Sequence, residues 1–565
     1  MLQQNGLLKS LFFDAPQDIL LSPELIDTTH DKIANVIHAK SGIRGHVTIA
    51  GLHGNISIYL PTDFPASKPV VCLDKYDSFG FVPHVDMKGE VCFCHSDNIL
   101  LDRYNPEGIV QSALTMAMQT IEKGIKGENT DDFLKEFDHY WISQNHIRRA
   151  ISLIDINSHP RNIYYQEDNG LLYVSDSNVA VNKAIKPKPL LSGLYLPLND
   201  SFTVSPPRFN TSWEASYLKT LYNSLNHNKQ KKLRKYLSEK AGKESLLVFS
   251  FSRPSEGKGS LGIYYKNTPV VKDTIPSCYT PVSLEREDPQ HLLARGGGHK
   301  SLQGKKVALI GCGAVGGHIA FELLRCGIHQ LLLVDHDKLC CENRYRHVCG
   351  HASDDYKVDV IKREIAAKYK ISEKIIVEKA RVQDALKKKP EIITNNDLII
   401  VAIGDPTTSL WLNEKVFNER KKWPPVLYTW LDPLSIGGHA LLTNNKGSKG
   451  CFECLFYRGT DEAPYNRASF VMPNQNFTKS LAGCASMFIP YSSMDALRTA
   501  EMASRLAIDT LLGKEHHSPL LSWKGDSTEI RDNGFLLSSR YNLSQDALFD
   551  SRYEYRFEHC RICSK

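Results

Sequence analysis

A glycine-rich turn between two apolar runs constrains this chain more than any other feature. Residues 307–317 read VALIGCGAVGG, and an apolar stretch of helical length separates them from residues 331–335, which read LLLVD. This order predicts a strand, a glycine turn, a helix and a second strand that ends at an acidic residue. Glycines let the backbone approach a phosphate at the positive N-terminus of a helix, and Asp335 lies about where a carboxylate can hold a ribose hydroxyl. Alone, the stretch therefore predicts a nucleotide site, most often one for a dinucleotide.

The residues beyond the second strand indicate which nucleotide is bound. Asn343 and Arg346 follow Asp335, Lys357 comes next, and Asp405 closes a later apolar run. Arginine forks suit bidentate contact with phosphate, and a carboxylate at a strand end can hold a metal ion. We therefore expect ATP with Mg²⁺, with Asp405 at the metal and Arg346 and Lys357 at the phosphates. A dinucleotide-binding Rossmann domain is the alternative.

These motifs resemble those of the ubiquitin-activating superfamily, whose bacterial members include the activators of molybdopterin and thiamine sulfur carriers. The resemblance runs from about residue 290 to the last residue. The matching positions are Gly311, Gly313, Gly316, Asp335, Asn343, Arg346, Lys357 and Asp405. The resemblance implies adenylation of a C-terminal carboxylate with loss of pyrophosphate, and a homodimer of activating domains.

Two pairs of cysteines predict a structural zinc site. Cys451 and Cys454 form one Cys-x-x-Cys pair, and Cys560 and Cys563 form the other. Four thiolates are the ligand set of tetrahedral structural Zn²⁺. Bacterial activating enzymes carry a matching pair, and the ion would tie the end of the chain to the domain. Free thiols or a disulfide are the alternatives.

A further cysteine lies between those pairs. Cys484 follows a glycine, and a helix is expected to open just after Pro490. A nearby helix N-terminus can lower the pKa of a thiol. Activating enzymes place their acceptor cysteine in this region, so the resemblance implies a thioester on Cys484; a small structural residue is the alternative. Cys312, Cys340 and Cys341 are interpreted as packing residues.

The N-terminal part has the pattern of an α+β domain. β-rich runs at 45–50, 54–60 and 68–73 are separated by turn residues. A helix is expected to open at Pro106. Its apolar positions recur at helical spacing: Ile109, Val110, Ala113, Leu114, Ala117 and Ile121.

This order resembles the ubiquitin-conjugating enzyme fold. In that family the cysteine after Gly-x-Ile/Val carries the thioester, which points to Cys92, and His84 matches the family's histidine. Val85 stands where the eukaryotic pattern has an asparagine, so the resemblance leaves open how the final amide forms. Cys94 competes with Cys92 for the assignment, and Cys92, Cys94 and His95 together could bind a metal. An inert strand cysteine is the remaining alternative.

Length and composition bound the whole chain. At 565 residues it exceeds one hydrophobic core, and the patterns divide it into 1–145, 146–285 and 286–565. The middle segment has short strand-like pieces and basic runs, and is interpreted as a linker domain. The fold class expected is α/β multidomain, with an N-terminal ubiquitin-conjugating-like fold, this linker, and a C-terminal Rossmann-like adenylation domain of the ThiF/MoeB type. Arg295 either lies on an N-terminal arm and reaches a neighbouring nucleotide site, or is part of a flexible hinge.

Charge and hydropathy exclude two classes of partner. A net charge of +6 over this length does not indicate nucleic-acid binding. No run reaches the ~18 apolar residues of a membrane span, and no secretory signal is apparent. With fourteen cysteines, these features indicate free thiols, metal ligands or catalytic cysteines in a reducing cytoplasm.

The presence of both domains in one chain resembles the activating–conjugating fusions encoded in bacterial CBASS anti-phage operons. The resemblance implies that the activated carboxylate is the C-terminus of a cGAS-like nucleotidyltransferase. The acyl group would pass from Cys484 to Cys92 and then to an amine, such as a target lysine. A sulfur-carrier activator would need no conjugating domain, a dinucleotide-binding oxidoreductase would bind NAD, and a scaffold would do no chemistry.

Overall fold

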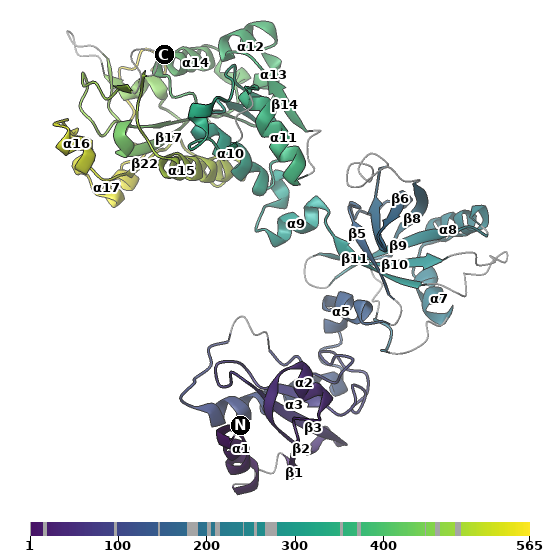
Figure 1. Ribbon diagram of the computed structural model, residues 1–565. Helices are drawn as coiled ribbons and strands as arrows, with labels where there is room; N and C mark the ends of the chain where they lie inside the picture. Colours follow the sequence, from purple (N-terminus) through teal and green to yellow (C-terminus); the bar gives the residue numbers. More distant parts are fainter. Residues whose placement is uncertain are drawn as a thin grey trace. The chain divides into compact units, whose positions relative to one another are not determined.

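The computed structural model describes most of the chain (Figure 1). The described residues are 2–14, 20–94, 99–144, 147–177, 190–200, 205–209, 215–240, 242–253, 257–265, 280–350, 354–369, 374–446, 448–457, 464–480 and 487–564. The chain divides into two compact units, Met1–Pro289 and Gln290–Lys565. The threefold division with boundaries near 145 and 285 remains a prediction. Within the described ranges, no helix is both long and apolar enough to cross a bilayer.

The first unit begins with a four-stranded antiparallel sheet. Its order is β1-β2-β3-β4, and the β-rich runs expected from the sequence overlap β2, β3 and β4. The elements are α1 (Leu2–Lys9), β1 (Leu21–Leu25), α2 (Lys32–Val36), β2 (Ala39–Ile49), β3 (Leu52–Pro61) and β4 (Val70–Leu73). Alternate residues of the strands point to one apolar face, so the sheet needs a cover on that side.

Helix α3 (Pro106–Lys126) provides that cover. Asn105 caps it by accepting a hydrogen bond from the Gly108 N–H, and Gly127 ends it in the left-handed conformation that glycine adopts without strain. The six apolar positions expected from the sequence are all buried, which confirms the helix and its inward face. Two short helices follow, α4 (Asp132–Lys135) and α5 (Phe137–Ile142).

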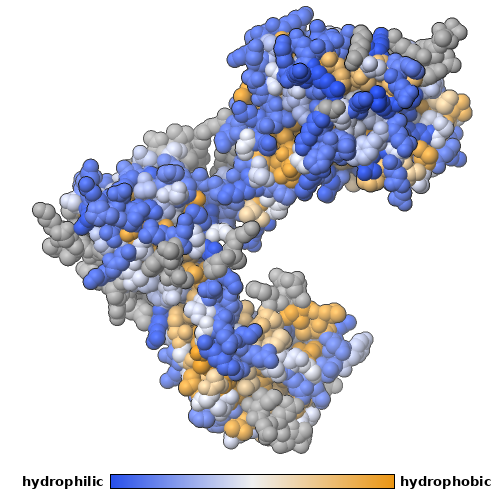
Figure 2. Space-filling model, turned by 180° about the vertical axis from the view of Figure 1, so that it is seen from behind, coloured by the Kyte–Doolittle hydropathy of each residue, from blue (hydrophilic) through white to orange (hydrophobic). Residues whose placement is uncertain are grey.

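The rest of the first unit is a closed seven-stranded barrel in the order β10-β11-β5-β7-β6-β8-β9. Its elements are β5 (Arg148–Ser152), β6 (Arg161–Asp168), β7 (Leu171–Ser175), β8 (Leu191–Pro197), α7 (Ala215–Asn223), α8 (His227–Glu239), β9 (Ser245–Ser252), β10 (Lys258–Tyr265) and β11 (Thr280–Arg286). Pairing of β9 with β10 closes the barrel. On the face drawn in Figure 2, the coloured part of the barrel is mostly hydrophilic, whereas the N-terminal sheet part shows more apolar residues.

The second unit is built on a seven-stranded sheet in the order β14-β13-β12-β15-β16-β17-β22. The strands are β12 (Lys306–Ile310), β13 (Gln330–Val334), β14 (Ile375–Glu378), β15 (Leu398–Val401), β16 (Val426–Leu431), β17 (Gly437–Thr443) and β22 (Leu520–Lys524). The first five in the sheet order are parallel. The chain runs outward from β12 through β13 to β14, then returns to β15 on the other side of β12. The order therefore reverses between β12 and β15, which is where ligands bind in sheets of this kind.

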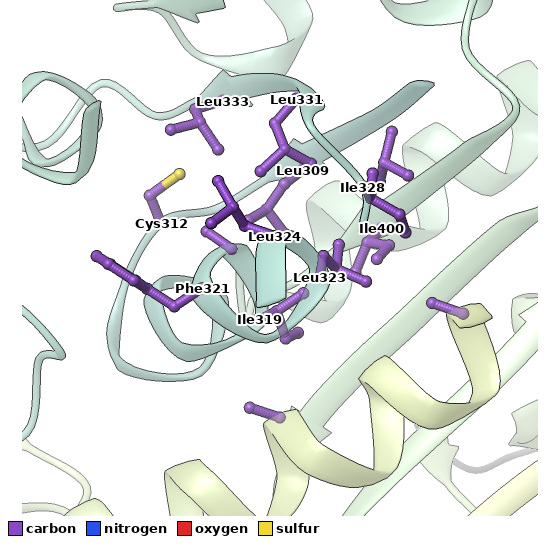
Figure 3. Close-up of a cluster of buried hydrophobic side chains, with 14 of the residues drawn as sticks. Leu309, Cys312, Ile319, Phe321, Leu323, Leu324, Ile328, Leu331, Leu333 and Ile400 are labelled. Atoms are coloured by element: carbon purple, nitrogen blue, oxygen red, sulfur yellow. The ribbon is translucent and has the colours of Figure 1, made fainter. Parts of the chain in front are cut away.

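Helices cover both faces of this sheet. The bounds are α10 (Ala314–Arg325), α11 (Lys357–Tyr369), α12 (Val382–Lys388), α13 (Glu391–Thr394), α14 (Pro406–Asn418) and α15 (Ser493–Leu511). Because strand side chains alternate, Leu309 packs with α10, α11 and α15 on one face, and Ala308 packs with α12, α13 and α14 on the other. Figure 3 shows the first of these cores, where Ile319 and Leu323 of α10 meet the sheet.

Short elements complete the second unit. They are α9 (Pro289–Arg295), β18 (Phe456–Tyr457), β19 (Tyr465–Asn466), β20 (Lys479–Ser480), β21 (Met487–Phe488), α16 (Thr528–Asp532) and α17 (Gln545–Asp550). Helix α15 opens shortly after Pro490, as the sequence predicts.

Candidate functional site

The glycine loop joins β12 to α10 at the point where the strand order reverses. The Gly311 N–H donates to the Val334 carbonyl, and Gly311 adopts a φ of +91° that favours glycine. A Cβ on Gly316 would lie 1.9 Å from the Gly311 oxygen, so close packing of helix and strand requires glycine there. Gly313 is different, since a Cβ there would meet no atom within 4 Å. It precedes the first turn of α10, where backbone N–H groups can bind a phosphate.

These two glycines predict opposite effects of alanine. Gly313→Ala should leave the melting temperature unchanged, because its φ of −75° suits alanine and space is open. It should weaken ATP binding about tenfold or more, because a methyl group would enter the phosphate space. Gly316→Ala should instead lower the melting temperature by several degrees, since overpacking costs about 1–3 kcal/mol. Calorimetry with Mg-ATP and a thermal melt check both; normal ATP affinity in Gly313→Ala would contradict this role of the loop.

Asp335 follows β13 and anchors the loop. Its Oδ2 accepts from the Cys312 N–H at 2.7 Å and its Oδ1 from the Asp337 N–H at 2.8 Å. Each oxygen keeps a further lone pair, so the carboxylate fits a ribose hydroxyl as well. Cys312 is fully buried, as expected of a packing residue.

His347 supports the same loop, although no sequence motif points to it. Its Nε2 lies 2.9 Å from the Cys312 carbonyl oxygen, and its Nδ1 lies 3.1 Å from the Cys349 nitrogen. A carbonyl only accepts and a backbone N–H only donates, so Nε2 carries the proton and the ring is neutral. Burial lowers the pKa of His347, in agreement with that form. Its partners are backbone atoms, which no residue pattern reveals.

Lys357 begins α11 and points to the same edge of the sheet. Its Nζ lies 2.9 Å from Oδ2 of Asp337, and the residue is 9% exposed. Burial acts to raise the pKa of Asp337, but the hydrogen bond and charge of Lys357 outweigh it and the pKa is lowered. A buried ammonium with one carboxylate partner has further N–H donors to offer a phosphate.

Asn343 and Arg346 lie in the turn that follows Asp335. The Asn343 Oδ1 accepts from the Cys340 N–H at 3.1 Å, and the Arg346 N–H donates to the Asn343 carbonyl. Asn343 thus shapes the turn that carries Arg346. The guanidinium of Arg346 lies over the ring of Tyr491, 4.8 Å from its centroid.

Asp405 follows β15, the neighbour of β12, and caps α14. Its carboxylate accepts from the N–H groups of Thr407 and Thr408, each at 3.1 Å, and from the Thr408 hydroxyl. Burial acts to raise its pKa, but these hydrogen bonds outweigh it and the pKa is lowered. The ionised, partly exposed oxygens keep lone pairs for a metal ion, so the residue fits Mg²⁺. Within the described residues, Asp405 forms no hydrogen bond or ion pair with the other candidate residues.

The four zinc-candidate cysteines come together. Sulfur–sulfur distances are 3.9 Å for Cys451–Cys454, 3.7 Å for Cys451–Cys560 and 3.3 Å for Cys454–Cys563. A disulfide requires about 2.05 Å, whereas a zinc tetrahedron with ~2.3 Å bonds has edges of roughly 3.8 Å. All four ligand atoms lie within 4.8 Å of one another. The donor set and its spacing fit structural Zn²⁺.

Cys92 lies beyond the edge of the N-terminal sheet and is exposed. Its N–H donates to the His84 carbonyl at 2.8 Å, and burial, followed by the charge of Glu136, raises the pKa of the thiol. Cys94 is less exposed, and its carbonyl accepts from Lys68 Nζ at 2.9 Å. The exposure of Cys92 suits a cysteine that must react with another protein. His95, the third residue of the alternative metal site, lies outside the described residues.

His84 is held from both sides. Its Nε2 lies 2.9 Å from Asp132 Oδ2, and its Nδ1 lies 2.9 Å from Glu136 Oε1. The hydrogen bond with Glu136 is the largest of the effects that raise the pKa of His84, and burial opposes it. The His84 N–H donates to the Tyr140 hydroxyl. With both ring nitrogens engaged, this arrangement positions the loop that carries Cys92; a catalytic role for His84 remains a prediction.

The raised pKa of His84 predicts a pH dependence of stability. A histidine whose folded pKa exceeds its ordinary value of 6.5 stabilises the fold fully below that value. The contribution is lost as pH rises through the folded pKa. The urea midpoint of the full chain should therefore fall above pH 6.5 more steeply than in His84→Gln. His139→Gln, at an exposed histidine of α5, should keep the wild-type slope; equal slopes in all three proteins would contradict the ion pairs.

The remaining cysteines named from the sequence have two outcomes. Cys484 lies outside the described residues, so its role as thioester cysteine remains a prediction. Cys340 and Cys341 are exposed, which contradicts their interpretation as packing residues. They lie in a turn beyond the strand, where the apolar pattern of the core no longer applies.

Comparison with known proteins now defines the class. Residues 23–149 match the model of Prokaryotic E2 family B, and residues 288–513 match that of the ThiF family. The chain is thus an α/β multidomain protein that joins an N-terminal E2-like domain to a C-terminal ThiF domain, which confirms the expected fold class.

Two of the similar proteins carry the same name. The chain is 22% identical over 458 residues to the ATP-dependent ubiquitin transferase-like protein Cap2 of Pseudomonas aeruginosa, covering 76% of this chain and 80% of that protein. It is 22% identical over 526 residues to Cap2 of Escherichia coli, covering 81% and 84%. These relatives confirm the expected resemblance to activating–conjugating fusions. Among solved structures, E. coli MccB with MccA matches at 16% identity and a TM-score of 0.34, covering 47% of this chain and 68% of MccB.

Proposed function

We propose that this chain uses ATP to activate the C-terminal carboxylate of a partner protein and transfers it through two thioesters to an amine. One observation carries the proposal. The same chain holds a phosphate-binding glycine loop, with Asp335 and Lys357 beside it, and an exposed cysteine on an E2-like domain. The name of its relatives, ATP-dependent ubiquitin transferase-like protein, supports the same reaction class.

The first step is adenylation. A carboxylate oxygen of the partner attacks the α-phosphorus of ATP, the bond to the bridging oxygen breaks, and pyrophosphate leaves with its electron pair. The backbone N–H groups after Gly313 bind phosphate oxygens, and Arg346 and Lys357 stabilise the charge that develops. Asp335 orients the ribose and Asp405 would hold Mg²⁺, which neutralises phosphate charge when bound.

Two transfers of the acyl group to cysteine sulfur follow. The thiol of Cys484 loses its proton to solvent, the thiolate attacks the acyl carbon, and the bond from that carbon to the AMP oxygen breaks so that AMP leaves. The Cys92 thiolate then attacks the same carbon, and Cys484 leaves as a thiolate. An amine nitrogen finally attacks, the carbon–sulfur bond breaks and an amide forms. Each thioester keeps the carbonyl activated toward nitrogen.

The partner and assembly belong to the same proposal. The activated tail is that of a cGAS-like nucleotidyltransferase in anti-phage defence, and the acceptor is a lysine or another amine. The four cysteines hold Zn²⁺, and two activating domains form a homodimer in the cytoplasm. Arg295, at the exposed end of α9, is the residue to test for a contact with a neighbouring nucleotide site.

Exchange of labelled pyrophosphate into ATP tests the first step. The full chain with a cGAS-like nucleotidyltransferase should catalyse exchange, and a partner with an amidated C-terminus should not support it. Exchange without any transfer to an amine would favour a sulfur-carrier activator. Binding of NAD without exchange would favour an oxidoreductase, and either result would overturn the proposal.

A further inference from the structure

Arg346 meets Tyr491 across a long sequence separation, and this contact has no place in the steps above. The guanidinium carbon lies 4.8 Å from the centroid of the tyrosine ring, and both residues are half-buried. Within the part of the chain that the structure describes, the guanidinium of Arg346 forms no ion pair and no hydrogen bond. Among the described residues, the ring of Tyr491 is therefore the contact available to hold this guanidinium in place.

The backbone at Tyr491 is fixed on both sides. The Pro490 carbonyl accepts from the Leu434 N–H at 3.1 Å. Ser492 caps α15 through its hydroxyl, which accepts from the Asp495 N–H, and the Asp495 carboxylate accepts from the Ser492 N–H at 2.8 Å. Such a reciprocal cap holds the first turn of a helix rigidly.

Helix α15 also packs against α10, the helix that the glycine loop opens. Figure 1 shows the two helices side by side. Tyr491 and the phosphate-binding loop therefore rest on one packed pair of helices. A ring placed on this support keeps a defined position relative to the loop.

We propose that Tyr491 is a positioning residue, whose ring holds the guanidinium of Arg346 ready for the phosphates of ATP. This role rests on the proposed function, which identifies the bound nucleotide as ATP. A guanidinium stacks through its face but donates hydrogen bonds from its edge, so both contacts form at once. Fixing the long side chain in advance reduces the entropy lost on binding.

The stacking surface, and not the hydroxyl, does this work. The Tyr491 hydroxyl forms no hydrogen bond within the described residues, so phenylalanine should replace it. Leucine fills similar space without an aromatic face. A half-buried cation–π contact is worth enough to change ATP affinity roughly fivefold.

A double-mutant cycle on the full chain tests the role. The dissociation constant of Mg-ATP is measured by titration calorimetry for wild type, Tyr491→Leu, Tyr491→Phe, Arg346→Ala and Tyr491→Leu with Arg346→Ala. We expect Tyr491→Leu to weaken binding about fivefold and Tyr491→Phe to stay within about twofold of wild type. In the Arg346→Ala background, Tyr491→Leu should have no further effect, because the cation it holds is gone.

A matched control removes a stack elsewhere in the same unit. Phe549→Leu abolishes the contact in which Arg552 lies 3.9 Å from the ring centroid of Phe549, and should leave ATP affinity unchanged. An equal loss from Tyr491→Leu with and without Arg346 would overturn the proposal, as would a loss in Tyr491→Phe as large as that in Tyr491→Leu. These outcomes leave the proposed function standing when pyrophosphate exchange persists. A wild-type chain that binds ATP but catalyses no exchange overturns the proposed function alone.

Discussion

Replacing Asp405 with asparagine should lower the rate of pyrophosphate exchange about 100- to 1000-fold, the range expected when a preorganised group that stabilises charge is removed. The carboxylate caps α14 through hydrogen bonds from Thr407 and Thr408. Asparagine ranks with aspartate as a helix cap, so the variant loses the negative charge and one acceptor oxygen but keeps an oxygen that can accept from the first turn of α14. The melting temperature should therefore fall by no more than a few degrees while exchange is lost.

A second aspartate in a similar local setting provides the control. Asp526 accepts from the Thr528 N–H at the start of α16, and hydrogen bonds with Thr528 lower its pKa. Asp526→Asn should keep full exchange. An Asp405→Asn protein that exchanges at the wild-type rate would show that Asp405 is only a helix cap.

Removing zinc should have the largest effect on stability. We expect one zinc per chain by elemental analysis, and its loss in Cys454→Ser, because a tetrahedral site needs all four thiolates. The ion would join residues near 451 to residues near 560, so losing it frees the end of the chain. A cost of several kcal/mol would lower the melting temperature of the second unit by about 10 °C.

Substitution of an exposed cysteine outside the cluster shows whether an effect comes from the loss of zinc or from the loss of any cysteine. Cys341→Ser should retain both the zinc and the melting temperature, since Cys341 is exposed and distant in sequence from the cluster. A wild-type protein that contains no zinc, or a chelator that leaves its melting curve unchanged, would contradict the assignment.

The elements read correctly from the sequence are those in which one periodic pattern decides burial. Helix α3 is an example, because its apolar residues recur at helical spacing and all face the sheet. The strand, glycine turn and helix from β12 to α10 follow from local backbone requirements, such as the close approach at Gly316. Such features depend on neighbours in the chain, which a sequence displays directly.

The features that escaped prediction depend on partners far apart in the chain. The barrel closes through the pairing of β9 with β10 and the parallel pairing of β8 with β9, and no local pattern specifies that closure. The contacts of His84 with α4 and the following residue Glu136, and of Arg346 with Tyr491, join separate segments. Sequence reasoning could propose His84 and Arg346 as site residues, but not the side chains that hold them.

The most direct test of the central claim is a non-reducing gel of the full chain with Mg-ATP and a cGAS-like nucleotidyltransferase. Wild type should form an ATP-dependent adduct with the nucleotidyltransferase that an added thiol reagent cleaves, and then an amide product. Cys484→Ala should abolish both, and Cys92→Ala should keep a thiol-sensitive adduct but lose the amide, while Cys94→Ala behaves as wild type. An amide product at the wild-type level from Cys92→Ala, or an adduct on Cys484→Ala, would contradict the relay from Cys484 to Cys92.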